Sequence, residues 1–222
     1  MGLINNTKNL IWETFRFFIN KKNIKRLTTI TPTIISSNCN GAIITHDLHL
    51  KFFSPTVNLF IYPKDYLSFV SNLDKYLSDE SELIQVESQC NYPIGKLIDI
   101  EIYFMHYDNF EEAKTKWYER CKRVQRDNIF LMMTDRDGCT YDDIANFDKL
   151  PYNKVIFTHK EYKEFKSAFY IKGFETDSCV GILSDKKNLW GERYIDSFDY
   201  VTFLNSRFPS TVEGQKATEK AF

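Results

Sequence analysis

Apolar residues recur along the chain in two different periods, and the alternation between these periods predicts its elements. Short runs of branched and aromatic residues are typical of buried strands, whereas apolar positions three or four residues apart are typical of one helix face. The first pattern predicts strands at 31–36, 58–61, 83–87, 94–105, 129–134 and 154–158, with one or two more between 169 and 183. The second predicts helices at 5–27, 63–79, 110–126, 141–150 and 194–205.

The order of these elements indicates the fold class. From residue 94 onward strands and helices alternate, and a strand–helix–strand unit joins parallel strands of one sheet. We therefore expect an α/β fold with a Rossmann-like, mostly parallel sheet flanked by helices and an N-terminal amphipathic helix. The expected organisation is a basic helix over 1–28, an α/β domain over 29–206 and a loosely ordered polar tail over 207–222.

The predicted helix at 5–27 combines an apolar stripe with a cationic side. A basic helix with aromatic residues on its apolar face can lie on an anionic membrane surface. The same stripe can pack against the domain, with lysines near the carboxyl end interacting favourably with the helix dipole. The pattern leaves both interpretations open. The stripe consists of Ile11, Trp12, Phe15, Phe18 and Ile19, and the cations are Lys8, Arg16, Lys21, Lys22, Lys25 and Arg26.

Polar residues follow three of the predicted strands, where parallel α/β sheets bind ligands. Asn38 and Gly41 follow the first strand, His106 follows the strand at 94–105, and Asp135 and Asp137 follow the strand at 129–134. A neutral imidazole is the natural general base near neutral pH, so His106 is the candidate base, with either aspartate as the alternative. These residues form the candidate site.

Each of these residues also has a purely structural interpretation. Asp108 could orient the His106 imidazole, but the same histidine could equally hydrogen-bond its own loop. The DRD sequence at 135–137 resembles the DxD pattern that holds a divalent metal in some glycosyltransferases, yet a charged turn closed by Gly138 explains it better. The HDLH segment at 46–49 is an equally weak metal signal, so we expect neither a metal site nor a cofactor.

Three cations lie on one flank of the predicted helix at 110–126. Lys116, Arg120 and Arg123 are spaced four and three residues apart, and arginine forks match phosphate oxygens in a bidentate manner. The alternative is a solvated face on which these cations pair with neighbouring glutamates. Because Arg120 and Arg123 border the apolar stripe of the helix, we expect them to bind substrate phosphate.

Composition excludes several classes of protein. With 29 basic and 30 acidic residues, the net charge of −1 gives no global basic surface for nucleic acid. The five cysteines are odd in number and contain no CxxC spacing, which disfavours a zinc site and a secreted disulfide framework. No apolar run approaches the roughly 20 residues of a membrane-spanning helix, and no signal peptide opens the chain. We therefore expect a cytoplasmic protein.

Six segments together resemble a bacterial family of unknown function that is usually labelled exopolysaccharide biosynthesis protein. They are NCNG, FFSPTVNLFI, YPIGKLIDIEIYFMHY, FEEAKTKWYERCKRV, NIFLMMTDRDGCT and FDKLPYNKVIFT, and the resemblance runs from about residue 31 to 205. One departure is the first loop, NCNGA here and commonly NCWGG in relatives, which lacks the aromatic side chain. The residues that the resemblance singles out are Asn38, Gly41, Ser54, Pro55, His106, Tyr107, Trp117, Arg120, Arg123, Asp135 and Asp137.

The resemblance implies a glycosyltransferase of capsule or exopolysaccharide biosynthesis. Such an enzyme would move a sugar, with galactofuranose as one candidate, from a nucleotide-sugar donor (a UDP-sugar foremost) to a lipid-linked saccharide acceptor. The resemblance assigns no catalytic role, but the residue types indicate that His106 would act as the base and that the helix cations would bind the diphosphate. Residues 5–27 would contact the membrane, at the inner face of the cell membrane. The alternatives are an acyl- or phospho-substituent transferase of the same pathway and a non-catalytic binding subunit.

Overall fold

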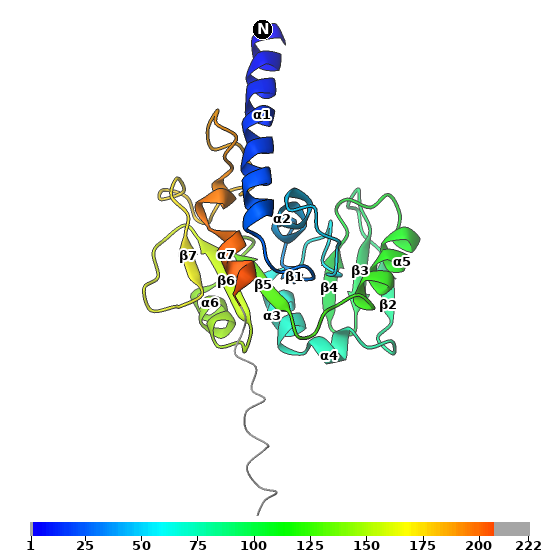
Figure 1. Ribbon diagram of the computed structural model, residues 1–222. Helices are drawn as coiled ribbons and strands as arrows, with labels where there is room; N and C mark the ends of the chain where they lie inside the picture. Colours follow the sequence, from blue (N-terminus) through cyan, green and yellow to red (C-terminus); the bar gives the residue numbers. More distant parts are fainter. Residues whose placement is uncertain (1, 207–222) are drawn as a thin grey trace, which may run out of the picture.

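A four-stranded parallel sheet forms the centre of the computed structural model, which describes residues 2–206 with side chains from residue 7 onward. The predicted α/β fold with a mostly parallel sheet flanked by helices is confirmed (Figure 1). The tail predicted at 207–222 lies outside the described residues. The strands, in their order across the sheet, are β1 (Thr33–Ser36), β5 (Ile129–Thr134), β6 (Asn153–Thr158) and β7 (Ala168–Tyr170).

Strand β5 is the buried centre of this sheet. It pairs with β1 through Leu131 and Ile35, and with β6 through Met133 and Ile156. All six residues of β5 are buried. Its first five residues, IFLMM, are all apolar because both faces of the strand are covered.

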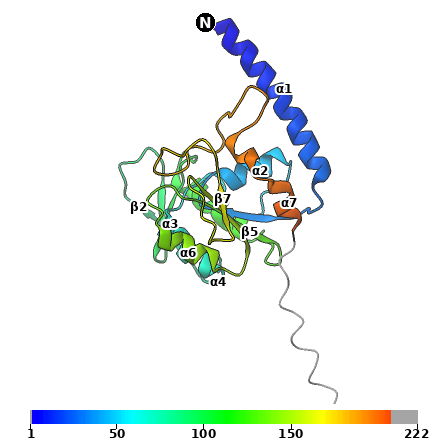
Figure 2. The same cartoon turned by 90° about the vertical axis from the view of Figure 1, so that its left-hand side faces the viewer.

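Helices cover both faces of the sheet (Figures 1 and 2). Alternate residues of β5 point to opposite faces, so Leu131 and Met133 belong to one core and Phe130 and Met132 to the other. The first core is completed by α3 (Pro63–Ser71), α4 (Leu73–Tyr76), α5 (Phe110–Cys121) and α6 (Tyr141–Asp148). The second is completed by α2 (Asn40–Asp47), the 3₁₀ helix η1 (Tyr194–Ser197) and α7 (Tyr200–Asn205).

The prediction of a single strand at 94–105 is wrong. This segment is a hairpin of β3 (Ile94–Leu97) and β4 (Ile100–Tyr103), which forms a second, antiparallel sheet with β2 (Leu83–Val86). Ile98 takes a left-handed φ of 60° in the two-residue turn, and Asp99 accepts a 2.7 Å hydrogen bond from the Tyr76 hydroxyl. The run of apolar letters conceals this turn because Ile98 is an unusual residue for a left-handed position.

Helix ends follow their capping residues more closely than the apolar periodicity. Asn109 caps α5 by accepting a hydrogen bond from the Glu112 N–H, as its place before the helix predicts. The predicted helix at 63–79 divides at Asn72 into α3 and α4. The helix predicted at 194–205 divides into η1 and α7, because Asp199 caps the second part by accepting from the Thr202 N–H.

Helix α1 (Gly2–Arg26) is present, but its burial does not follow the predicted stripe. Trp12 is buried, and so is Arg16, which the pattern assigned to the polar side, whereas Phe18 is exposed. The Arg16 guanidinium lies 2.6 Å from the Asp47 carboxylate of α2 and 2.5 Å from that of Asp196. No helix within residues 2–206 is long and apolar enough to cross a membrane.

Replacing Arg16 by methionine should destabilise the protein by about 3–5 kcal/mol, because two largely buried carboxylates lose a charged partner. Urea unfolding followed by circular dichroism measures this change in the free energy of unfolding. The control is Arg26→Met, which removes the solvent-exposed pair with Asp199 on the same helix. That pair is worth about 0–1 kcal/mol, so equal losses in the two variants would contradict a stabilising role for the buried contact.

Candidate functional site

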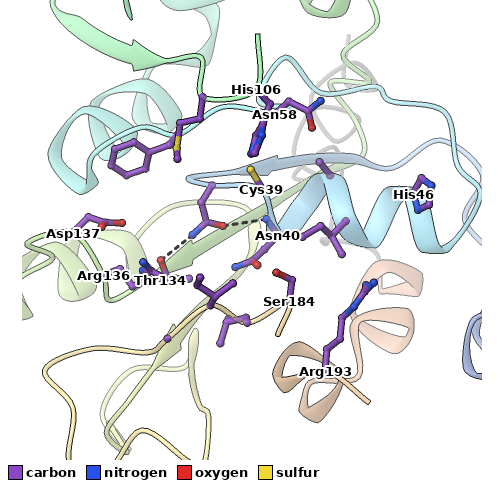
Figure 3. A pocket seen from close by; sticks show the side chains of 18 of the residues that line it. Cys39, Asn40, His46, Asn58, His106, Thr134, Arg136, Asp137, Ser184 and Arg193 are labelled. Carbon is purple, nitrogen blue, oxygen red and sulfur yellow. Dashed lines mark hydrogen bonds between the residues drawn. The ribbon is translucent and has the colours of Figure 1, made fainter. Parts of the chain in front are cut away.

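A cavity of about 910 Å³ opens at the carboxyl ends of β1 and β5 (Figure 3). Its volume lies within the range of about 300–1,000 Å³ that is usual for small-molecule sites. The lining comes from α2, from the segments after β1, β4 and β5, and from residues within 52–62, at 92, at 181–184 and at 193. The polar and aromatic side chains in the lining include Asn38, Asn40, Asn58, Phe60, Tyr62, Tyr92, His106, Arg136, Asp137 and Arg193.

Asn38 joins the two strand ends at the cavity wall. Its side-chain amide donates to the Thr134 hydroxyl at 3.1 Å, and its carbonyl oxygen accepts from the Asn40 N–H at 3.1 Å (Figure 3). The side chain therefore fixes the turn between β1 and α2 against the end of β5. Asn38 follows β1 directly, and the carboxyl ends of neighbouring parallel strands meet at one edge of the sheet.

Gly41 lies beside the cavity wall but does not line it. A Cβ at this position would lie 2.9 Å from both the Ile34 Cγ2 and the Ser36 Cβ. Such a distance is too short for real side chains, so only glycine permits α2 to pack this closely on β1. Its contribution to the site is to set the position of α2.

His106 and Asp137 line the same cavity from different parts of the chain. His106 follows β4 and Asp137 follows β5, where it takes a left-handed φ of 60° next to Gly138. The structure therefore brings together three predicted site residues, because Asn38 lies in the same wall. Asp108, the candidate partner of His106, forms no ion pair with it within residues 7–206 and lines a different hollow.

Asp135 is buried beneath the site and is not part of the cavity lining. One of its carboxylate oxygens accepts from the His159 N–H at 2.7 Å and lies 2.5 Å from the His159 Nδ1. The other oxygen accepts from the Val180 N–H at 2.8 Å. Asp135 thus fastens the end of β5 to the end of β6 and to the loop at 180–184, which lines the cavity. His159 was not among the predicted site residues, although it follows β6 directly, as Asp135 follows β5.

The three cations of α5 are not part of the cavity lining. Lys116 and Arg123 both pair with Glu119, at 3.4 and 3.5 Å. The Arg120 guanidinium donates to the Val57 carbonyl at 3.2 Å and to the Tyr107 hydroxyl. Burial raises the pKa of that tyrosine, and Arg120 opposes the effect. The structure does not bring these cations together with His106 and Asp137.

Two other arginines line the cavity instead. Arg136 lies between the two aspartates of the DRD turn, and its guanidinium has no ion pair among the described residues. Arg193 donates to the Asp47 carboxylate at 2.6 Å and lies over the Trp12 ring. The DRD pattern could have indicated the first arginine. No local signal marks the second, because its place depends on contacts with α1 and α2.

Replacing Asp135 and Asp137 by asparagine, one at a time, should change the free energy of unfolding by clearly different amounts. Asp135→Asn places an amide donor against donors that are buried, and it should cost about 2–4 kcal/mol of stability. Asp137 is exposed and asparagine tolerates its left-handed φ, so Asp137→Asn should change stability by less than about 0.5 kcal/mol. Urea denaturation of both variants tests this. An Asp135→Asn variant as stable as the unchanged protein would refute the anchoring role of Asp135.

Comparison with known proteins places the chain in a family. A protein of Haemophilus influenzae (strain ATCC 51907 / DSM 11121 / KW20 / Rd), described as an uncharacterized protein, is 50% identical over 199 residues, which cover 89% of this chain and 96% of that protein. A family model described as a domain of unknown function, DUF1919, matches residues 10–205. Because the match includes both sheets and every residue named above as lining the cavity, the chain belongs to the DUF1919 family.

Proposed function

We propose that the cavity at the ends of β1 and β5 catalyses glycosyl transfer in the biosynthesis of a capsule or exopolysaccharide. The observation that supports this best is the combination of His106, Asp137 and Arg136 in one cavity, where Arg136 is a cation without an ion pair within residues 7–206. A transferase needs a base for the acceptor hydroxyl and a cation for the leaving diphosphate. The resemblance described above, which points to surface-polysaccharide assembly, supplies the substrate class.

The proposed reaction is a single displacement at the anomeric carbon of a nucleotide-sugar donor. The acceptor oxygen forms a bond to that carbon while the bond from the carbon to the diphosphate oxygen breaks. The acceptor proton passes to the His106 imidazole, and the electron pair leaves with the diphosphate. Asp137 is the alternative base. One displacement inverts the configuration of the anomeric carbon.

The aromatic wall of the cavity fits the nucleoside part of the donor. Phe60, Tyr62 and Tyr92 line it, and bases stack well on such rings. Phe60 and Tyr62 already form an edge-to-face pair with ring centroids 4.6 Å apart. We take a UDP-sugar as the donor. In this proposal Arg136 replaces the cations of α5 as the group that stabilises the diphosphate, since it lines the cavity.

Replacing His106 by glutamine should lower transfer by about 10²-fold or more, because a neutral amide cannot accept the acceptor proton. The rate is followed as UDP release from UDP-sugars in the presence of a short-chain lipid-linked saccharide. His49→Gln is the control, since His49 is not among the residues that line the cavity. Full turnover by His106→Gln would refute the assignment of the base.

Thermal shifts with UDP, CDP and coenzyme A test the reaction class. Stabilisation by UDP is the expected result. Stabilisation by coenzyme A alone would favour an acyl transferase of the same pathway, and no shift with any of the three would favour a non-catalytic binding subunit.

We propose further that α1 holds the protein at an anionic membrane surface, where a lipid-linked acceptor lies. Figures 1 and 2 show the N-terminal part of α1 projecting beyond both sheets. Phe17 and Phe18 are 60% and 58% exposed. Lys21, Lys22 and Lys25 follow on the same helix, and exposed aromatic residues beside lysines are typical of helices that bind anionic bilayers. The inner face of the cell membrane is the proposed location.

A double change of Phe17 and Phe18 to glutamate should reduce sedimentation with phosphatidylglycerol vesicles by at least about tenfold, since two apolar side chains no longer enter the interface. Ile84→Glu is the control, because Ile84 is 55% exposed on the second sheet. Equal sedimentation of the double variant and the Ile84→Glu control would overturn the proposed membrane contact. Concentration-dependent dimerisation that the double change abolishes would instead assign this surface to a second copy of the chain.

A further inference from the structure

The amino end of α2 reaches the cavity without the usual capping. The N-cap residue, Cys39, makes no side-chain hydrogen bond to the helix. The Asn40 N–H donates to the Asn38 side chain, but the N–H groups of Gly41 and Ala42 meet no acceptor in the described part of the chain. Free N–H groups and the helix dipole together give this end a partial positive charge.

The side chain of Asn40 is the second sign of a ligand at this place. Asn40 is only 7% exposed, yet it lines the cavity (Figure 3). Within the described residues its side-chain amide has no hydrogen-bond partner. The small exposed part of Asn40 faces the cavity, so its amide can donate to a molecule bound there. A hydrogen bond to a charged acceptor is stronger than one to water or to a neutral group.

We infer that the amino end of α2, Asn40 and Arg136 form a phosphate-binding site. The Ala42 N–H and the Asn40 amide, which both line the cavity, donate to phosphate oxygens, and the Arg136 guanidinium supplies the balancing charge. Helix amino ends bind phosphate in this way, and arginine forks fit its oxygens. The nearby carboxylate of Asp47 does not oppose the anion, because Arg16 and Arg193 both pair with it. The assignment of this phosphate to the diphosphate of a sugar donor rests on the proposed function.

Asn40→Asp tests the site with little change of shape. It places a negative charge where the phosphate should bind, and a carboxylate in the first turn favours the helix, so the protein should remain folded. Isothermal titration calorimetry with pyrophosphate, UDP, uridine and a short-chain prenyl phosphate measures binding. We expect pyrophosphate and UDP to bind, uridine to bind at least about tenfold more weakly than UDP, and Asn40→Asp to raise the Kd of both phosphates at least about tenfold.

Asn58→Asp is the matched control, because Asn58 lines the same cavity from a loop outside α2. It adds the same charge and should change the Kd of pyrophosphate less than threefold, roughly the effect of screened charges in water. Equal weakening by the two variants would overturn the assignment to α2, as would unchanged binding by Asn40→Asp or no binding of any phosphate. If the protein binds prenyl phosphate but not UDP, and Asn40→Asp abolishes this binding, the result would support the site and assign it to the lipid substrate.

The test of the phosphate site can fail or succeed independently of the test of sugar transfer. Pyrophosphate binding that Asn40→Asp abolishes, in a protein that transfers no sugar, would support the phosphate site and refute the transferase. Sugar transfer that Asn40→Asp leaves unchanged would support the transferase and refute the phosphate site.

Discussion

The buried carboxylate of Asp47 is the contact on which the arrangement of the site depends. It accepts hydrogen bonds from Arg16 of α1, from Asn20 one turn further along that helix, and from Arg193 before η1. A buried carboxylate requires such partners, because burying an unpaired charge costs several kcal/mol. This requirement brings three segments together that lie far apart in the sequence. Two of them, α2 and the segment at Arg193, form part of the cavity wall.

Much of the central sheet and one edge of the site could be predicted from the sequence. The run IFLMMT predicts a strand buried on both faces, and β5 is that strand. Once β1 and β5 are parallel neighbours, their carboxyl ends must meet at one edge. Asn38 and Asp137 therefore share a cavity. The same reasoning cannot distinguish Asp137 from Asp135, because the difference depends on the N–H groups of His159 and Val180, which lie 24 and 45 residues from Asp135.

The remainder of the site depends on tertiary contacts that leave no local pattern. His106 lines the cavity although the strand assumed to carry it is a hairpin, so a parallel strand end does not explain its position. The cations of α5 share a flank, but periodicity shows only that they are neighbours on a helix. It does not show which way that flank faces. Arg16 illustrates the same limit, since its polar character predicted exposure and its two acidic partners made burial favourable.

Helix α2 connects the proposed phosphate site with α1, the helix proposed to bind the membrane. Its amino end presents Asn40 to the cavity, and its last residue, Asp47, binds α1. Eight helical residues span about 12 Å, and Gly41 lets this short helix pack directly on β1. A rigid element of this length fixes the distance between the proposed phosphate site and the part of α1 that binds Asp47, at Arg16 and Asn20. If Phe17 and Phe18 of α1 rest on a membrane, the opening of the cavity is then held at a constant height above the membrane surface. Such an arrangement suits an acceptor whose lipid stays in the bilayer while its sugar enters the cavity.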